Sequence, residues 1–357
     1  MTPRQRIDTV IAGRQADRTP IWGGWIASPR HIQNITQTSD DEYWADPFAV
    51  SVRAYETLGM DGLLAVFVPR KRGEYRCVDN ESFHEEHTRL SLEEAIASID
   101  ARPGPEHHEA NFDFDTAYAE FRQALIDAQA KVEPMVWAPA QWGIGAEVSC
   151  YGEFGYENYF YLVAEHEPQM RKLIEISAVV GRQRAAMLAR AMQDGLYPRA
   201  ALIGEDICTQ RGPMVSPAFL EKHFAPALKH GLEPLVNVGA RLVWHCDGDV
   251  RPLLDMLFDC GIKGLQGFQP ECGMDIDSVA RRRTADGEKL LIYGPLSVTT
   301  ELPVLSPDEI RRRTRHAIDV CRDQADLILF TANTITPDIP MDNLEAMYET
   351  ARTYVPW

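Results

Sequence analysis

Positive charge is scarce in this sequence. Lysine and arginine number 36 against 53 aspartates and glutamates in 357 residues, so the formal net charge is −17. A surface of this kind repels phosphate backbones and anionic lipids. We therefore expect neither a nucleic acid nor a membrane as a partner, and we expect a small-molecule substrate instead.

Cysteine pairs and long apolar runs are also missing. The seven cysteines are odd in number and scattered, without a CxxC pair, which argues against a disulfide framework and favours a reducing compartment. No segment approaches the roughly 18 consecutive apolar residues of a membrane-spanning helix. The opening stretch MTPRQRIDTVIAGRQ lacks the apolar core of a secretory signal. We expect a cytoplasmic protein.

Three glycine motifs that mark common enzyme classes are absent from the sequence. It contains no GxGxxG after a strand, no GxxxxGK[ST] and no GxSxG. The first two motifs bind nucleotide phosphates, and the third presents a serine nucleophile. Nucleotide-cofactor and serine-hydrolase chemistry therefore lack their usual sequence support.

What is present is a repeated pattern of short hydrophobic runs between longer helical segments. Each run ends in glycine, proline or polar residues, which is typical of βα repetition around a parallel sheet. The predicted strands cover residues 19–26, 60–68, 132–139, 199–206, 240–248, 262–269, 289–296 and 326–333. Because eight βα units close a TIM barrel, we expect an α/β protein with a single (β/α)8 TIM barrel and an N-terminal helical extension.

Two helix starts are well marked, and one segment does not fit the repeat. Ser216 before Pro217 and Ser306 before Pro307 are each a capping residue followed by proline at the first helical position. Residues of about 70–115 predict a β-hairpin insertion followed by an acidic loop. No change of composition divides the chain, so we predict one domain over residues 1–357.

The predicted strand ends carry the polar residues on which a functional hypothesis depends. In a β/α barrel the chemistry lies where strands end and βα loops begin. His245 and Asp247 share one side of the fifth strand because side chains alternate. With Glu205 at the end of the neighbouring strand, they predict a three-ligand metal site that leaves a position open for substrate or water.

Other roles for these residues remain open at this point. A single HxD is common, and His245 could simply hydrogen-bond Asp247 or Glu205 without any metal. Arg211 could clamp a substrate carboxylate, or it could neutralise the neighbouring acids Glu205 and Asp206.

Further strand ends supply candidate substrate contacts. The predicted substrate-binding residues are Asp206, Gln269, Glu271 and Asn333. Cys272 has no basic neighbour in the sequence, so we expect an inert thiol rather than a nucleophile. The aromatic stretch 151–163 could line a pocket for an aromatic ligand, although core and subunit contacts are the commoner use of such residues.

Four blocks of the sequence together resemble the uroporphyrinogen decarboxylase superfamily. They are TPRQRIDTVIAGRQADRTPIW, GEDICTQRGPMVSPAFLEKHFAPALKHGL, HCDGDVRPLLDMLFDCGIKGLQGFQPECGMD and TPDIPMDNLEAMYETAR. The resemblance spans nearly the whole chain and also implies a TIM barrel. It implies one of two activities, namely cofactor-free decarboxylation of uroporphyrinogen or zinc-dependent methyl transfer linked to a corrinoid.

The details of the resemblance favour the methyl-transfer branch. The decarboxylases carry an arginine-rich motif after the first strand and an aspartate after the second, whereas this sequence has GGWIASPRH and LLAVFVPRK there. Thiol-directed methyltransferases carry His-x-Cys at the fifth strand and a further Cys at the eighth. Here His245 matches, but Asp247 and Asn333 replace the two cysteines. This more oxygen-rich site suits an ether or hydroxyl oxygen better than a thiol.

We therefore expect a methyltransferase of the O-demethylase type. Glu205, His245 and Asp247 would hold zinc and act with Arg211 on a methoxylated small substrate. The corrinoid would come from a separate protein, because the sequence has no DxHxxG loop. The alternatives are a metal-assisted or cofactor-free decarboxylase or lyase of a small carboxylate, and a non-catalytic relative that only binds a ligand. The resemblance also implies a homodimer.

Overall fold

The computed structural model describes residues 1–69, 72 and 90–356. The chain divides into two compact units, of which unit 1 holds residues 1–83, 125–140 and 264–357, and unit 2 holds residues 84–124 and 141–263. The long helix α7 (Phe114–Val132) begins in unit 2 and ends in unit 1. The prediction of a single domain over residues 1–357 stays a prediction.

Unit 1 is built on parallel strands. β1 (Trp22–Gly23), β2 (Gly62–Leu63) and β3 (Val136–Trp137) pair in that order. β8 (Ile262–Gln266), β9 (Leu291–Leu296) and β10 (Asp326–Thr331) also pair in that order. Parallel bridges from Ile21 to Leu329 and from Ile26 to Ile335 join the two sets. Six parallel strands therefore follow one another in this unit, which holds β8 from Gly264 onward.

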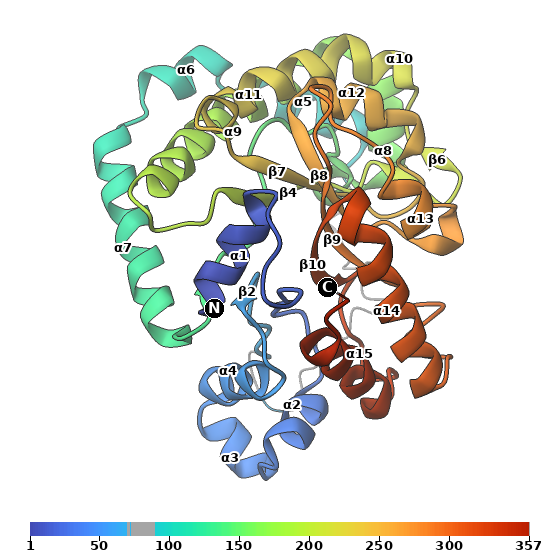
Figure 1. Cartoon of the computed structure of the whole chain (residues 1–357). Helices are drawn as coiled ribbons and strands as arrows, with labels where there is room; N and C mark the ends of the chain where they lie inside the picture. The colour runs from blue at the N-terminus through green and yellow to red at the C-terminus, as the bar shows by residue number, and fades with distance from the viewer. Residues whose placement is uncertain (70–71, 73–89, 357) are drawn as a thin grey trace. The chain divides into compact units, whose positions relative to one another are not determined.

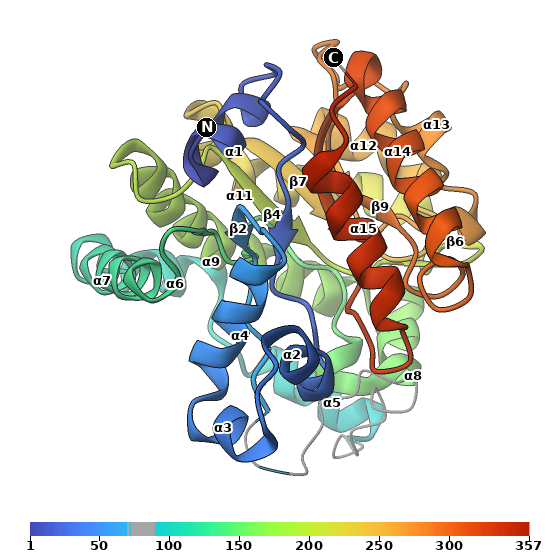
Figure 2. The same cartoon turned by 60° about the horizontal axis from the view of Figure 1, so that its bottom comes forward.

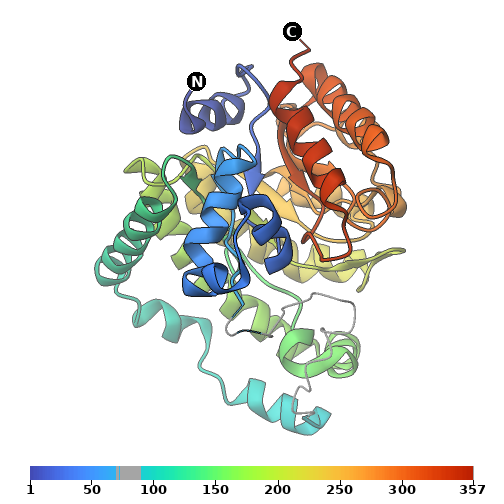
Figure 3. The same cartoon turned by 90° about the horizontal axis from the view of Figure 1, so that it is seen from below.

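Helices precede, connect and follow these strands. They are α1 (Pro3–Ile11), α2 (Pro29–Thr36), α3 (Asp40–Ala45), α4 (Pro47–Thr57), the 3₁₀ turn η3 (Pro270–Cys272), α13 (Ile276–Val279), α14 (Pro307–Gln324) and α15 (Met341–Thr353). Figure 2 shows α14 and α15 packed side by side, and Figure 3 shows α2, α3 and α4 as a group. Helix α1 confirms the predicted N-terminal helical extension.

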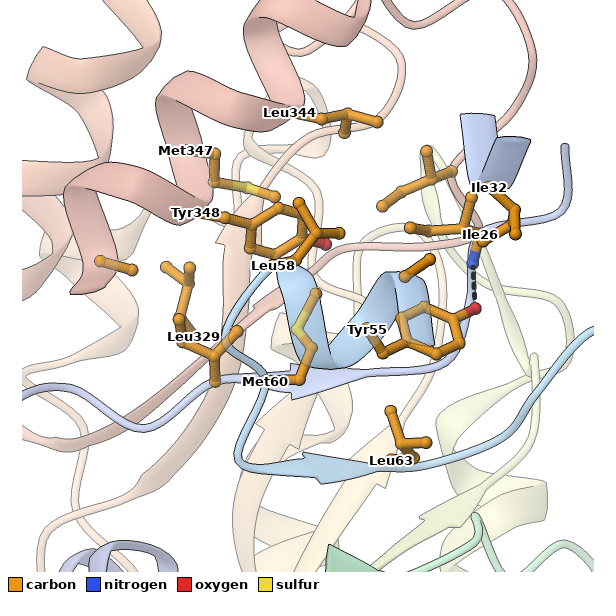
Figure 4. Close-up of a cluster of buried hydrophobic side chains, with 14 of the residues drawn as sticks. Ile26, Ile32, Tyr55, Leu58, Met60, Leu63, Leu329, Leu344, Met347 and Tyr348 are labelled. Atoms are coloured by element: carbon orange, nitrogen blue, oxygen red, sulfur yellow. Dashed lines mark hydrogen bonds between the residues drawn. The ribbon is translucent and has the colours of Figure 1, made fainter. Parts of the chain in front are cut away.

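The core of unit 1 lies between these helices and the strands (Figure 4). Tyr55 of α4 and Leu58, which directly follows this helix, pack with Met347 and Tyr348 of α15 and with Leu329 of β10. All five side chains are nearly inaccessible to solvent. The hydroxyl of Tyr55 accepts a hydrogen bond of 3.4 Å from the backbone N–H of Ile26. A buried hydroxyl needs such a partner, so α4 is fixed against the segment after β1.

Unit 2 contains one parallel strand pair and one small hairpin. β4 (Ala200–Gly204) pairs with β7 (Arg241–His245), and the register places Gly204 opposite His245. β5 (Cys208–Thr209) and β6 (Gly212–Pro213) form an antiparallel hairpin in the loop after β4. No sequence pattern predicted this hairpin.

The helices of unit 2 surround that pair. They are α5 (Leu92–Asp100), α6 (Pro105–Ala110), α8 (Tyr151–Glu165), α9 (Glu167–Gln193), α10 (Pro217–Phe219), the π-helical turn η1 (Leu220–Phe224), α11 (Ala225–Asn237), the 3₁₀ turn η2 (Arg251–Leu253) and α12 (Leu254–Asp259). In Figure 1, α9 lies beside α11, its most extensive packing partner. No helix among the described residues is both long enough and apolar enough to cross a membrane.

All eight predicted strands contain an observed parallel strand, which confirms the βα pattern.

The predicted insertion of about residues 70–115 does not follow the sequence prediction in its described part. Its predicted β-hairpin lies almost entirely outside the described residues. The predicted acidic loop after the hairpin is wrong, because the helices α5 and α6 form in that part of the chain. Ser91 caps α5 by accepting from the backbone of Glu94, whose carboxylate accepts from Ser91 in return. This capping box explains why an acidic segment is helical.

The same motif begins α14 and can be tested. The Ser306 hydroxyl accepts from the Glu309 backbone, and Oε2 of Glu309 accepts a 2.9 Å hydrogen bond from the Ser306 N–H. Ser306→Ala is expected to lower the free energy of unfolding by about 1 kcal/mol, because one N-terminal donor loses its acceptor. Urea unfolding measures the loss, and Ser306→Asp, which keeps a capping oxygen, should retain most of the stability. Equal stability of the alanine variant and the parent would contradict the role of the cap.

Candidate metal centre

The ends of two neighbouring strands of unit 2 position the candidate site. β4 and β7 remain paired up to Gly204 and His245. Gly204 has a φ of +129°, and a Cβ at this position would lie 2.4 Å from the backbone oxygen of His245. Only glycine permits this approach. The chain therefore leaves β4 directly beside the last residue of β7.

Three side chains converge at this point and form the carboxylate–imidazole cluster of Asp206, His245 and Asp247. One possible ligand atom from each residue lies within 4.8 Å of the others. Nε2 of His245 is 3.6 Å from Oδ1 of Asp206, and the same oxygen accepts a 2.7 Å hydrogen bond from the backbone N–H of Asp247. The side chain of His245 is 11% exposed and that of Asp206 is 35% exposed. Within the cluster, the His245 side chain is therefore largely shielded from solvent, whereas the Asp206 side chain is accessible to it.

The donor set of this cluster fits a divalent cation. An imidazole nitrogen and carboxylate oxygens are ligands that zinc accepts, and three protein ligands leave a position for substrate. The two carboxylates would balance the charge of such a cation.

Glu205 does not belong to the cluster, although the sequence predicted it as the third ligand. Its carboxylate accepts hydrogen bonds of 2.9 Å from the backbone N–H groups of Val148 and Ser149, and another from the Ser149 hydroxyl. Desolvation raises the pKa of Glu205 to about 7, although these hydrogen bonds oppose the shift. In the structure Glu205 holds the 148–149 backbone, and Asp206 lies where we expected Glu205.

The loop after β4 places Arg211 away from Glu205 and Asp206. Arg211 lies in the exposed turn between β5 and β6, where its backbone N–H donates to the Thr209 hydroxyl. The guanidinium pairs with neither Glu205 nor Asp206 within the part of the chain that the structure describes. Neutralisation of these acids is therefore not its role here, and substrate binding by Arg211 stays a prediction.

The other predicted substrate contacts belong to unit 1. The carboxylate of Glu271 accepts hydrogen bonds from the hydroxyls of Ser297, Thr299 and Thr300, which ties the loop after β8 to the loop after β9. The Oδ1 atom of Asn333 accepts from the backbone of Thr334.

Gln269 and Cys272 meet in the loop after β8. The side-chain oxygen of Gln269 lies 3.6 Å from the buried sulfur of Cys272, which donates to it. The structure thus shows a hydrogen-bond partner within unit 1 for each of Gln269, Glu271 and Asn333. Their predicted substrate-binding roles stay predictions.

Aromatic rings border the cluster within unit 2. Trp142 makes an edge contact with the imidazole of His245, with ring centroids 5.4 Å apart. The Tyr151 hydroxyl donates a 2.9 Å hydrogen bond to the backbone oxygen of Asp206. Burial raises the pKa of Tyr151, and the charge of Asp206 adds to this, so the hydroxyl remains a donor. Tyr151 belongs to the aromatic stretch that the sequence marks as a possible pocket lining, whereas no sequence pattern indicated Trp142.

Comparisons with known proteins agree with this architecture. Residues 153–354 match the family model described as uroporphyrinogen decarboxylase (URO-D). A solved structure of a methyltransferase from Methanosarcina mazei is similar in fold, with 14% sequence identity, a TM-score of 0.56, and coverage of 99% of this chain and 98% of that chain. No curated protein sequence matches the chain. The predicted (β/α)8 TIM-barrel class is confirmed.

Proposed function

The chain belongs to the uroporphyrinogen decarboxylase family, and on this premise we propose that it is a zinc-dependent methyltransferase. It would move a methyl group from a methoxylated small molecule to a corrinoid protein. The observation that carries the proposal is the meeting of Asp206, His245 and Asp247 at the ends of β4 and β7. The fold similarity to a methyltransferase supports the choice of reaction.

Asp206, His245 and Asp247 would hold the zinc, with Asp206 in the place that we predicted for Glu205. When bound, zinc supplies a Lewis acid that polarises the ether oxygen of the substrate. The chain fixes these side chains in advance, because the Asp247 N–H holds the Asp206 carboxylate and the Tyr151 hydroxyl holds its backbone. Groups that are already oriented need little reorganisation during the reaction.

The reaction breaks the bond between the methyl carbon and the ether oxygen. The methyl group would pass to the corrinoid acceptor without its bonding electrons, which would stay on the oxygen, and the alcohol product would take up one proton from solvent. We expect the acceptor to reach the site on a separate corrinoid protein. A cytoplasmic location and a homodimer stay part of the prediction.

Methyl transfer to free cob(I)alamin tests the proposal. The protein, loaded with zinc under anaerobic conditions, is incubated with methoxylated compounds and reduced cobalamin, and methylcobalamin is followed by its absorption spectrum. We expect methylcobalamin only when zinc, the methyl donor and the protein are all present. Protein stripped of zinc with a chelator serves as the matched control.

Two other outcomes would contradict methyl transfer. Release of carbon dioxide from a small carboxylate without any cobalamin would favour the decarboxylase alternative, with Arg211 as carboxylate clamp and His245 as proton donor. Binding of a ligand with neither reaction would favour a non-catalytic relative.

A further inference from the structure

We propose that Trp142 determines substrate specificity by offering its indole to a planar ring of the methyl donor, so that the preferred substrates are aryl methyl ethers. This inference rests on the proposed function, because it names the substrate class of the same site. It starts from large aromatic side chains that stay exposed beside the carboxylate–imidazole cluster.

Trp142 stands next to the histidine of the cluster. Its position is set by the preceding residue Gln141, whose backbone N–H donates a 2.7 Å hydrogen bond to the Leu202 oxygen of β4. The indole meets the imidazole of His245 at an interplanar angle of 63°, yet 47% of the Trp142 surface is exposed. His245 is thus covered by an indole that still has apolar surface open to a ligand.

A second half-exposed ring borders the cluster at Asp206. Tyr156 is 51% exposed and stacks on Tyr151 with a centroid distance of 4.6 Å and an interplanar angle of 12°. Tyr151 in turn donates its hydroxyl hydrogen to the Asp206 backbone. Aromatic surface therefore flanks both His245 and Asp206.

This surface fits a neutral planar ring better than other methyl donors. Ligand sites combine apolar and aromatic walls with a few polar groups that fix orientation. Aromatic rings gain from offset or edge-to-face packing beyond the area that they bury. The carboxylates Asp206 and Asp247 and the net charge of −17 oppose an anionic aliphatic donor.

Binding of two matched ethers tests the proposal without any methyl transfer. Anisole and methoxycyclohexane have the same heavy-atom skeleton, but only anisole is aromatic. Calorimetric titration of the zinc-loaded protein, with no cobalamin present, should give about three- to tenfold tighter binding of anisole. Trp142→Leu is expected to bring this ratio close to one, whereas Trp142→Phe should keep most of it. Tyr161→Leu, which removes a ring of similar exposure from α8, is the control and should leave the ratio unchanged.

The outcomes separate this inference from the proposed function. No preference in the parent, no measurable binding of anisole, or an unchanged ratio in Trp142→Leu overturns the inference, even if methyl transfer occurs. A ratio that depends on Trp142 supports it, even if no methylcobalamin forms. Equal zinc content in the parent and the variants shows that the ring, and not the metal, causes the change.

Discussion

Replacing His245 with alanine should weaken zinc binding by more than about a hundredfold and abolish zinc-dependent methyl transfer. The substitution removes the nitrogen ligand of the cluster, and loss of a supporting partner alone typically costs ten- to a hundredfold in metal affinity. Competition with a chromophoric chelator measures the affinity, and methylcobalamin formation measures the activity. The alanine also removes the edge contact between the imidazole of His245 and the Trp142 ring.

A second histidine of unit 2 provides the control for this variant. His230 lies on α11, outside the cluster. His230→Ala should therefore keep the zinc affinity and activity of the parent. If His245→Ala binds zinc as tightly as His230→Ala does, the cluster does not hold the metal. If the ligand affinity of His245→Ala is intact and the parent catalyses no reaction, the protein is a binding relative rather than an enzyme.

Asp247→Asn should lower zinc affinity by about ten- to a hundredfold at neutral pH. Asparagine keeps the size and much of the hydrogen bonding, but it lacks the negative charge that balances a divalent cation. The backbone N–H of residue 247 can still donate to Asp206, so the effect isolates the charge of the side chain. We expect little change in the free energy of unfolding, because a strand-end residue at an open site contributes little packing.

Two further variants sharpen this test. Asp249 lies in the same loop, and its carboxylate pairs with Arg251 at 2.7 Å. Asp249→Asn is therefore the control, and it should leave zinc affinity unchanged. Asp247→Cys creates a softer His-x-Cys pair, so it should retain zinc but impair chemistry on an oxygen donor. If Asp247→Asn keeps normal zinc affinity and turnover, then His245 and Asp247 are not metal ligands and only contribute hydrogen bonds at the strand ends.

The strands were predictable from the sequence because each is a short apolar run that ends in glycine, proline or polar residues. The helix predicted from Ser216 is present too, with the π-helical turn Leu220–Phe224 inside it. Pro226 has no N–H to donate to the carbonyl of Lys222, so the regular hydrogen-bond pattern cannot continue there. The sequence contained this proline, but its local effect was not predicted.

The third member of the cluster could not be predicted by counting along the strand. Alternation of side chains holds only while the chain keeps strand geometry. At Gly204 the backbone enters the positive-φ region, so the directions of Glu205 and Asp206 no longer follow from the strand. Glu205 turns to the backbone of Val148 and Ser149 instead. Those partners lie more than fifty residues away in sequence, where no local pattern indicates them.

The X-ray absorption spectrum of the zinc-loaded protein at the zinc edge tests the central claim most directly. We predict a first shell of nitrogen and oxygen atoms only, at about 2.0–2.2 Å, with the outer-shell signal of a single imidazole. This pattern follows because Asp206, His245 and Asp247 offer one imidazole nitrogen and carboxylate oxygens as ligands, and no sulfur. Sulfur atoms at about 2.3 Å would assign the metal to cysteines elsewhere, and a protein that retains no zinc would contradict the metal centre altogether.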